Sequence, residues 1–158
     1  MFSDKRFMTA RYAYGEIKAK YIILHHTGTL RDCSSYLASP GDGRKVSVHF
    51  HINRKGVVTQ YTNLIQLGEK RVWKAAHAGV SFYKGVSNFN NRSIGIEMDG
   101  DGKVPFTAQQ YEALRSLVRE LMKVFDIPKV NILLHREIAP RRKNDPNPFN
   151  KMEFLNSL

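Results

Sequence analysis

The sequence predicts an α/β (α+β) fold, a single domain with a mixed central β-sheet flanked by helices. Short apolar runs rich in β-branched residues are interleaved with at least one long amphipathic helical pattern. The length of 158 residues is ordinary for one domain, and internal repeats and low-complexity segments are absent. We therefore take residues 1–158 as one domain.

The N-terminal third contains one clear strand. Residues 1–20 are mixed and basic, and we expect them to form an irregular N-terminal arm over the body. Residues 21–24 form an apolar run that is typical of a buried strand and ends on two histidines. Residues 29–38 are expected to hold a short helix, which the loop signal Ser-Pro-Gly-Asp-Gly ends.

A hairpin is predicted next. Residues 46–52 alternate between apolar and polar, which predicts a strand with one apolar face and with His49 and His51 on the other. A turn containing glycine follows, and residues 57–61 form the returning strand. Residues 66–86 are expected to be a loop.

The most regular helix follows a further strand. Residues 93–98 alternate as a strand. Thr107 is a natural helix N-cap, and Gln110, three residues later, completes a capping box. Apolar side chains then recur at helical spacing as far as Phe125, and a proline ends the pattern.

Residues 131–148 combine the clearest chemical signals of the chain. An apolar run predicts a buried strand that turns polar at His135. A basic cluster and three prolines follow, which predicts a loop carrying Lys143 and Asp145. Loops braced by a scaffold often carry function, so we expect these three side chains to lie in one site.

Composition limits the possible partners. The net charge of +11 leaves nucleic acid, an acidic membrane surface and an anionic cell-wall polymer open. No nucleic-acid-binding motif accompanies the basic residues, and we expect no nucleic-acid partner. No apolar run is long enough to span a membrane. The single Cys33 excludes an internal disulfide and a cysteine-rich zinc site.

Two histidines at predicted strand ends suggest a metal site. A catalytic zinc site needs about three protein ligands. His25 and His135 each follow an apolar strand, and Asp145 lies on the loop after the second. If the strands are neighbours, these side chains converge at the sheet edge. The pattern alone leaves open that each is an ordinary polar loop residue.

Taken together, the motifs resemble the zinc-dependent N-acetylmuramoyl-L-alanine amidase family, which includes the peptidoglycan-recognition proteins. They follow the family's order over nearly the whole domain, and the ordered set is specific where each motif alone is weak. The matching pieces are Ile-Leu-His25-His-Thr-Gly, Val-Ser-Val-His49-Phe-His-Ile-Asn-Arg-Lys-Gly, Ala-His77-Ala-Gly, Ser-Ile-Gly-Ile-Glu97 and His135-Arg-Glu-Ile-Ala-Pro-Arg-Arg-Lys143-Asn-Asp145-Pro.

The resemblance implies a set of roles. His25, His135 and Asp145 are expected to bind one Zn²⁺ per chain, which can lower the pKa of its bound water to about 7. Glu97 is expected to take a proton from that water, and Lys143 to stabilise the oxyanion. Non-catalytic relatives typically lack the third ligand, so the presence of Asp145 favours an enzyme.

We also expect four residues to contact the substrate, namely His26, Trp73, His77 and Arg92. Groove lining and structural support remain equally open for His26. A lone tryptophan is as often structural as it is a stacking platform. His77 matches a family position near the substrate, and a simple loop histidine is its alternative.

The implied activity is cleavage of the amide bond between N-acetylmuramic acid and L-alanine in peptidoglycan or muropeptide. Compact length and basicity favour a small phage-type endolysin, a bacteriolytic enzyme that acts in cell wall degradation. The alternatives are a cytosolic amidase that recycles anhydro-muropeptides and a non-catalytic peptidoglycan-binding module. We expect a monomer made in the cytoplasm without a signal peptide, which as an endolysin would reach the host wall at lysis.

Overall fold

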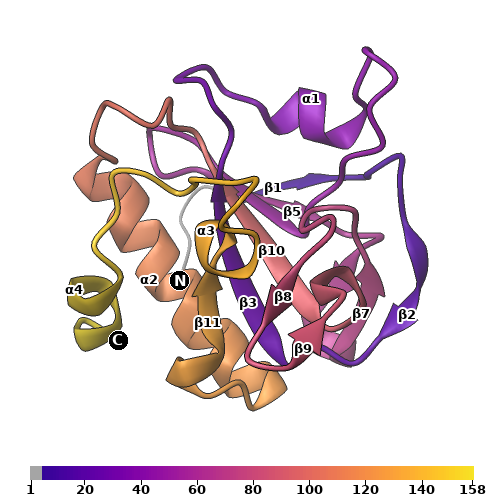
Figure 1. Cartoon of the computed structure of the whole chain (residues 1–158). Coiled ribbons are helices and arrows are strands. Elements are labelled where there is room, and N and C mark those ends of the chain that lie inside the picture. The colour runs from indigo at the N-terminus through magenta and orange to yellow at the C-terminus, as the bar shows by residue number, and fades with distance from the viewer. Residues whose placement is uncertain (1–4) are drawn as a thin grey trace.

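The computed structural model describes residues 5–158 and contains one mixed six-stranded sheet (Figure 1). Four of its five strand pairs are parallel, and only the β4–β5 hairpin is antiparallel. This confirms the predicted fold class. The strand order is β1 (Lys5–Met8), β5 (Val58–Tyr61), β4 (Phe50–Ile52), β10 (Ser93–Met98), β3 (Tyr21–His26) and β11 (Ile132–Leu134).

The two faces of this sheet differ because side chains alternate along each strand. Ile22 and Leu24 of β3, with Ile94 and Ile96 of β10, pack on one face against helix α2 (Ala108–Phe125). The intervening positions point to the other face, where the backbones of His25, Glu97 and His51 lie side by side in register. The register therefore gathers polar side chains on the face away from α2.

Helix α2 begins and ends as the sequence predicts. Thr107 accepts a hydrogen bond from the backbone of Gln110, whose side chain accepts one from the Thr107 N–H. Asp126 ends the helix with a φ of 54°. The buried stripe on the sheet side comprises Gln110, Ala113, Leu114, Leu117, Val118 and Leu121.

The C-terminal stretch differs from the prediction after its strand. Strand β11 leads directly into one helical turn, α3 (His135–Ile138), where we expected a loop. The turn forms because the Glu137 carboxylate accepts a hydrogen bond of 2.7 Å from the Leu134 N–H and is paired with Lys151. A loop over residues 139–150 then carries Lys143 and Asp145 to the last helix, α4 (Lys151–Asn156).

The prediction that residues 1–20 form an irregular arm needs correction. Within the described part of the arm, β1 extends the main sheet beside β5, and β2 (Tyr14–Ile17) pairs with β7 (Arg71–Lys74). The partners are distant in sequence, and four-residue strands give no readable periodicity, so composition suggested a coil. Phe2 of the arm lies outside the described residues.

Two further predictions need correction. The segment 66–86, predicted as a loop, contains β7 and β8 (Phe82–Tyr83), which pair with β6 (Ile65–Gln66) and β9 (Val86–Ser87), respectively. Only the last three residues of segment 46–52 form a strand. Val48 packs in a separate cluster with Leu37 and Tyr61, although the backbone of the next residue, His49, is still hydrogen-bonded to Gly95 and Tyr61.

The remaining elements lie over the two faces of the sheet (Figure 1). Helix α1 (Ser34–Ala38) forms within the segment where a short helix was predicted. In Figure 1, α2 lies behind the sheet, whereas α3 and the β8–β9 hairpin lie in front of it. None of the helices in residues 5–158 is long and apolar enough to cross a membrane.

Candidate active site

The carboxyl ends of three neighbouring parallel strands form the site. His25 lies near the end of β3, Glu97 near the end of β10, and His135 directly after β11. Asp145 reaches the same point from the loop that follows α3. Ligand sites of parallel sheets characteristically lie outside this edge. Strand direction thus explains why residues more than 100 positions apart meet.

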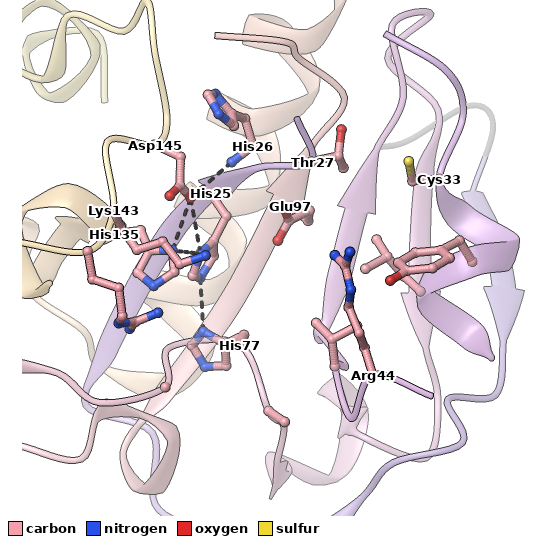
Figure 2. Close-up of a pocket in the computed structure, with 16 residues that line it drawn as sticks. His25, His26, Thr27, Cys33, Arg44, His77, Glu97, His135, Lys143 and Asp145 are labelled. Atoms are coloured by element: carbon pink, nitrogen blue, oxygen red, sulfur yellow. Dashed lines mark hydrogen bonds and ion pairs between the residues drawn. The ribbon is translucent and has the colours of Figure 1, made fainter. Parts of the chain in front are cut away.

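Three buried ligand atoms face one another at this edge (Figure 2). His25 Nδ1 lies 2.9 Å from His135 Nδ1 and 3.6 Å from Asp145 Oδ2. His135 Nδ1 lies 3.0 Å from the same carboxylate oxygen. Ligand atoms around a tetrahedral Zn²⁺ lie about 3.3 Å apart, given bonds of 2.0–2.1 Å. The two nitrogens and one carboxylate oxygen therefore fit such an ion in spacing and in chemistry.

The protonation states also suit metal ligands. Burial lowers the pKa of His25 to about 4, although Asp145 opposes the shift, so the ring is neutral at pH 7. Burial raises the pKa of the Asp145 carboxyl, but the facing ring nitrogens of His135 and His25 outweigh it. The pKa of Asp145 therefore lies well below its usual value. A metal ligand needs a neutral histidine and an ionised carboxylate.

A cleft of about 360 Å³ opens above these three residues, and Glu97 and Lys143 line it. Burial and the nearby charge of Asp145 raise the pKa of Glu97 to about 8, even though the positive charge of Lys143 acts in the opposite direction. A carboxyl group with a pKa near neutrality can exchange a proton with a reacting group. Lys143 contributes a positive charge on the side of the cleft that holds Asp145 (Figure 2).

The four expected substrate-contacting residues occupy different places. His26 lines the cleft, and its Nδ1 accepts a hydrogen bond of 3.2 Å from the Asn147 N–H. His77 also borders the cleft but is buried directly behind His25, with 2.9 Å between its Nδ1 and His25 Nε2. Its two ring nitrogens have protein partners, so its surroundings are those of a supporting residue.

Trp73 and Arg92 do not line the cleft, and their expected contacts with substrate stay predictions. Trp73 belongs to β7 and packs against the cluster around Tyr61, with the Arg71 guanidinium 4.7 Å from its ring centroid. Arg92 precedes β10, so it lies at the end of that strand opposite to Glu97. Neither residue lines the described cleft.

The far wall of the cleft was not predicted. Cys33, Tyr36 and Arg44 come from α1 and its flanking loops and line the cleft. Cys33 and Arg44 lie across it from the candidate ligands His25, His135 and Asp145 (Figure 2). Burial and the charge of Asp99 raise the pKa of the Cys33 thiol to about 11, so it is protonated at neutral pH. This wall depends on how a loop folds over the sheet, for which the sequence carries no local signal.

His49 and His51 have structural partners and do not belong to the candidate ligand group of His25, His135 and Asp145. His49 Nε2 lies 2.8 Å from the Trp73 carbonyl oxygen, and its Nδ1 accepts from the Gly95 N–H at 2.9 Å. His51 Nε2 lies 2.8 Å from Asp99 Oδ1. These contacts match the expectation that both histidines belong to the core or support the site.

Asp32 lies near His51 and Asp99 and forms a second group of potential metal ligands. Arg6 and Asn53 donate to the same Asp32 oxygen at 2.8 and 2.9 Å, which already satisfies its charge. We therefore interpret this group as a polar brace that joins β1 to the loop before α1.

Comparisons with known proteins agree with this geometry. Residues 15–148 match the N-acetylmuramoyl-L-alanine amidase family. The chain is 40% identical over 116 residues to the 1,6-anhydro-N-acetylmuramyl-L-alanine amidase AmpD of Haemophilus influenzae, covering 72% of this chain and 59% of that protein. AmpD of Escherichia coli is 37% identical over 135 residues, covering 85% of this chain and 69% of that protein. The chain thus spans about three fifths of the Haemophilus relative.

Solved structures show the same architecture. A selenomethionine derivative of AmpD superposes with a TM-score of 0.83 over all of this chain and 96% of that one, at 24% identity. AmiD of Escherichia coli, solved with anhydro-N-acetylmuramic acid-L-Ala-D-γ-Glu-L-Lys, superposes with a TM-score of 0.71 at 30% identity, covering 94% of this chain and 60% of that one. The chain belongs to the N-acetylmuramoyl-L-alanine amidase family.

Proposed function

We propose that this chain is a zinc-dependent amidase that cleaves the bond between N-acetylmuramic acid and L-alanine in soluble anhydro-muropeptides. One observation carries the proposal: His25, His135 and Asp145 converge on one point, in a cleft that Glu97 and Lys143 also line. Relatives 36–40% identical to the chain are 1,6-anhydro-N-acetylmuramyl-L-alanine amidases, which supports this bond and this substrate class.

The relatives favour the recycling alternative over the phage-type endolysin, so the endolysin and bacteriolytic assignments are corrected. Length and basicity had favoured the endolysin, but both are coarse properties that many enzymes share. The endolysin amidase LysCS from Clostridium intestinale is 20% identical to this chain, a similarity that shows the fold alone. That the protein acts in the cytoplasm and that it is a monomer both remain predictions.

His25, His135 and Asp145 would hold the zinc ion, which supplies Lewis-acid activation of a water and of the scissile carbonyl. Glu97 takes the proton from the attacking water and passes it to the leaving nitrogen of L-alanine, which a group with a pKa near neutrality can do. Lys143 places a positive charge beside the carbonyl oxygen as negative charge develops there. Asp145 stays ionised throughout.

The non-catalytic binding module is the second candidate. It requires only a cleft that recognises muropeptide, and the basic Arg44 and Lys143 on opposite walls suit an anionic ligand. The presence of a full ligand triad beside a carboxyl group of raised pKa favours the enzyme. A chain that retains zinc tightly and binds muropeptide without releasing a stem peptide would contradict our proposal.

The decisive experiment compares two substrates side by side. Purified zinc-loaded protein is incubated with soluble anhydro-muropeptides and, separately, with intact sacculi, and the products are identified by mass spectrometry. We expect free stem peptide and anhydro-N-acetylmuramic acid products from the soluble substrate, with much slower release from sacculi. Preferred release from sacculi would return the assignment to a wall-degrading enzyme.

A further inference from the structure

His77 lies directly behind the candidate ligand His25. Its Nδ1 is 2.9 Å from His25 Nε2, and the two rings are perpendicular with centroids 5.1 Å apart. The other ring nitrogen of His77 is 3.2 Å from Ser93 Oγ, and the His77 side chain is buried. His25 therefore uses one nitrogen toward the metal cluster and the other toward His77.

The directions of these hydrogen bonds follow from the contact farthest from the candidate metal site, which is the one between Ser93 and Phe89. Ser93 Oγ lies 2.5 Å from the Phe89 carbonyl oxygen, which can only accept, so the Ser93 hydroxyl donates to it. Ser93 Oγ then accepts from His77 Nε2–H. A neutral His77 has its lone pair at Nδ1 and accepts from His25 Nε2–H. His25 Nδ1 is consequently left with a lone pair facing His135 and Asp145.

The next residue, Ala78, does the same for the second histidine ligand. His135 Nε2 lies 3.2 Å from the Ala78 carbonyl oxygen, which again can only accept. His135 therefore carries its proton on Nε2, and its Nδ1 lone pair faces the cluster. Two adjacent residues thus accept hydrogen bonds from the two histidines, His77 through its side chain and Ala78 through its backbone carbonyl.

This pair of residues is itself held in place. The Asn90 side-chain oxygen accepts hydrogen bonds from the His77 N–H at 3.1 Å and from the Ala78 N–H at 2.7 Å. A Cβ atom at Gly95 would lie 2.6 Å from His77 Cγ, so only glycine leaves room for the ring. A glycine inside the central strand β10 is otherwise unfavourable, which its role beside His77 explains.

We propose that segment 77–78, anchored by Asn90 and Ser93, is the positioning device that keeps Nδ1 of both His25 and His135 free to bind the metal. The inference rests on the metal site of the proposed function. It assigns His77 a positioning role in place of the expected contact with substrate. Outer hydrogen-bond partners of metal-bound histidines typically change metal affinity by about 10–100-fold.

The first test compares two variants of His77 by zinc affinity, measured by competition with a chromophoric chelator. His77→Phe keeps the ring shape and removes the acceptor, so we expect zinc to bind about 10–100-fold more weakly. His77→Asn keeps an acceptor oxygen close to the position of Nδ1, and we expect affinity within about threefold of the wild type. Unchanged affinity in His77→Phe with a raised KM would overturn the proposal in favour of substrate contact.

A second pair of variants tests the anchor without touching the histidine. Asn90→Ala removes the acceptor for both backbone N–H groups, whereas Asn90→Asp retains it. We expect weaker zinc binding in the first variant and near wild-type binding in the second. Equal zinc affinity in the two variants would overturn the anchoring role, and this pair decides the question if His77→Phe does not fold.

His49→Phe is the matched control, because His49 is a buried histidine that packs edge-on against the His77 ring and hydrogen-bonds to neither His77 nor a candidate metal ligand. We expect it to lower stability and to leave zinc affinity unchanged. A loss of zinc affinity as large as that of His77→Phe would mean that His77 acts only through general packing.

Nuclear magnetic resonance of the ¹⁵N-labelled, zinc-loaded protein gives a readout independent of catalysis. We expect the His25 Nε2–H proton of the wild type to be shifted downfield and protected from exchange. In His77→Phe it should lose both properties, while the His135 proton keeps them. These measurements distinguish the two proposals. If the wild type cleaves muropeptide but His77→Phe binds zinc as tightly as the wild type, the positioning role alone is refuted. If His77→Phe binds zinc more weakly but the wild type does not cleave muropeptide, the amidase activity alone is refuted.

Discussion

The two faces of the central sheet are built from the same strands and serve different purposes. On the α2 face, Ile22 and Ile94 belong to a dry apolar core, which is stabilised by burial alone. On the opposite face, His25 and Glu97 occupy the alternate positions of the same strands and are surrounded by polar partners. The comparison teaches that the reactive side chains occupy one face, and only near the carboxyl ends of its strands, since Ile23 on the same face as His25 packs in a small apolar cluster.

The largest expected effect comes from removing a ligand on the polar face. Asp145→Ala should abolish zinc retention and reduce cleavage to background, because two histidines alone do not complete the site. Metal analysis after gel filtration and a muropeptide assay measure this. Glu120→Ala, an exposed carboxylate on α2, is the control and should change neither property. A variant at position 145 that retains full zinc and activity would refute the ligand set.

Loss of the proton-transferring group should separate metal binding from turnover. Glu97→Gln keeps the shape of the side chain and cannot take a proton, so we expect kcat to fall by about 10²-fold or more. Zinc content and the unfolding midpoint should remain close to those of the wild type. Wild-type rates in this variant would remove Glu97 from the mechanism.

A change on the apolar face should do the reverse. Leu117 is fully buried against the sheet, and Leu117→Ala should lower the free energy of unfolding by about 2–5 kcal/mol. Chemical denaturation measures the loss. Zinc affinity and kcat of the folded fraction should be unchanged, since the cluster lies on the other side of the sheet. A selective loss of activity in the folded protein would show that the faces are coupled.

The last expected effect concerns pH. Burial lowers the pKa of both His25 and His49 to about 4 from an ordinary value of 6.5. Between these values the unfolded chain binds protons that the folded chain does not, so the stability of the metal-free protein should rise from pH 4 to 6.5. The rise is on the order of 3 kcal/mol for each histidine.

Glu97 works in the opposite direction, because its raised pKa makes stability fall between about pH 4.5 and 8. The measurement is therefore best made in a Glu97→Gln background, with denaturation followed at several pH values. Adding His49→Phe should flatten the slope. An unchanged slope would mean that His49 does not contribute to the pH dependence.

The sequence predicted the elements that have strong local signals. Strand β10 and helix α2 follow from alternation and from the Thr107 capping box. The ends of β3 and β11 pointed to His25 and His135, and the family resemblance supplied the remaining roles. Parallel pairing of these strands then brings the side chains together without further information from the sequence.

Other features depend on contacts between distant segments. Strands β1, β2 and β7 are four residues long and form only because edges elsewhere in the chain accept them. The position of His77 behind His25 depends on a loop anchored by Asn90, so the local motif Ala-His-Ala-Gly could not distinguish support from substrate contact. Trp73 and Arg92 lie outside the described cleft, and contact of either residue with substrate stays a prediction.

The sequence separation of the candidate ligands has a consequence for folding. His25 and His135 are 110 residues apart, and β11, which precedes His135, is an edge strand held by β3 alone. A cation bound by both residues acts as a cross-link in a chain whose single cysteine allows no internal disulfide. Closing a covalent loop of about 100 residues removes roughly 4.7 kcal/mol of chain entropy from the unfolded state. A chelator should accordingly loosen the C-terminal edge of the sheet first, exposing β11 and α3 to hydrogen exchange before the α2 core.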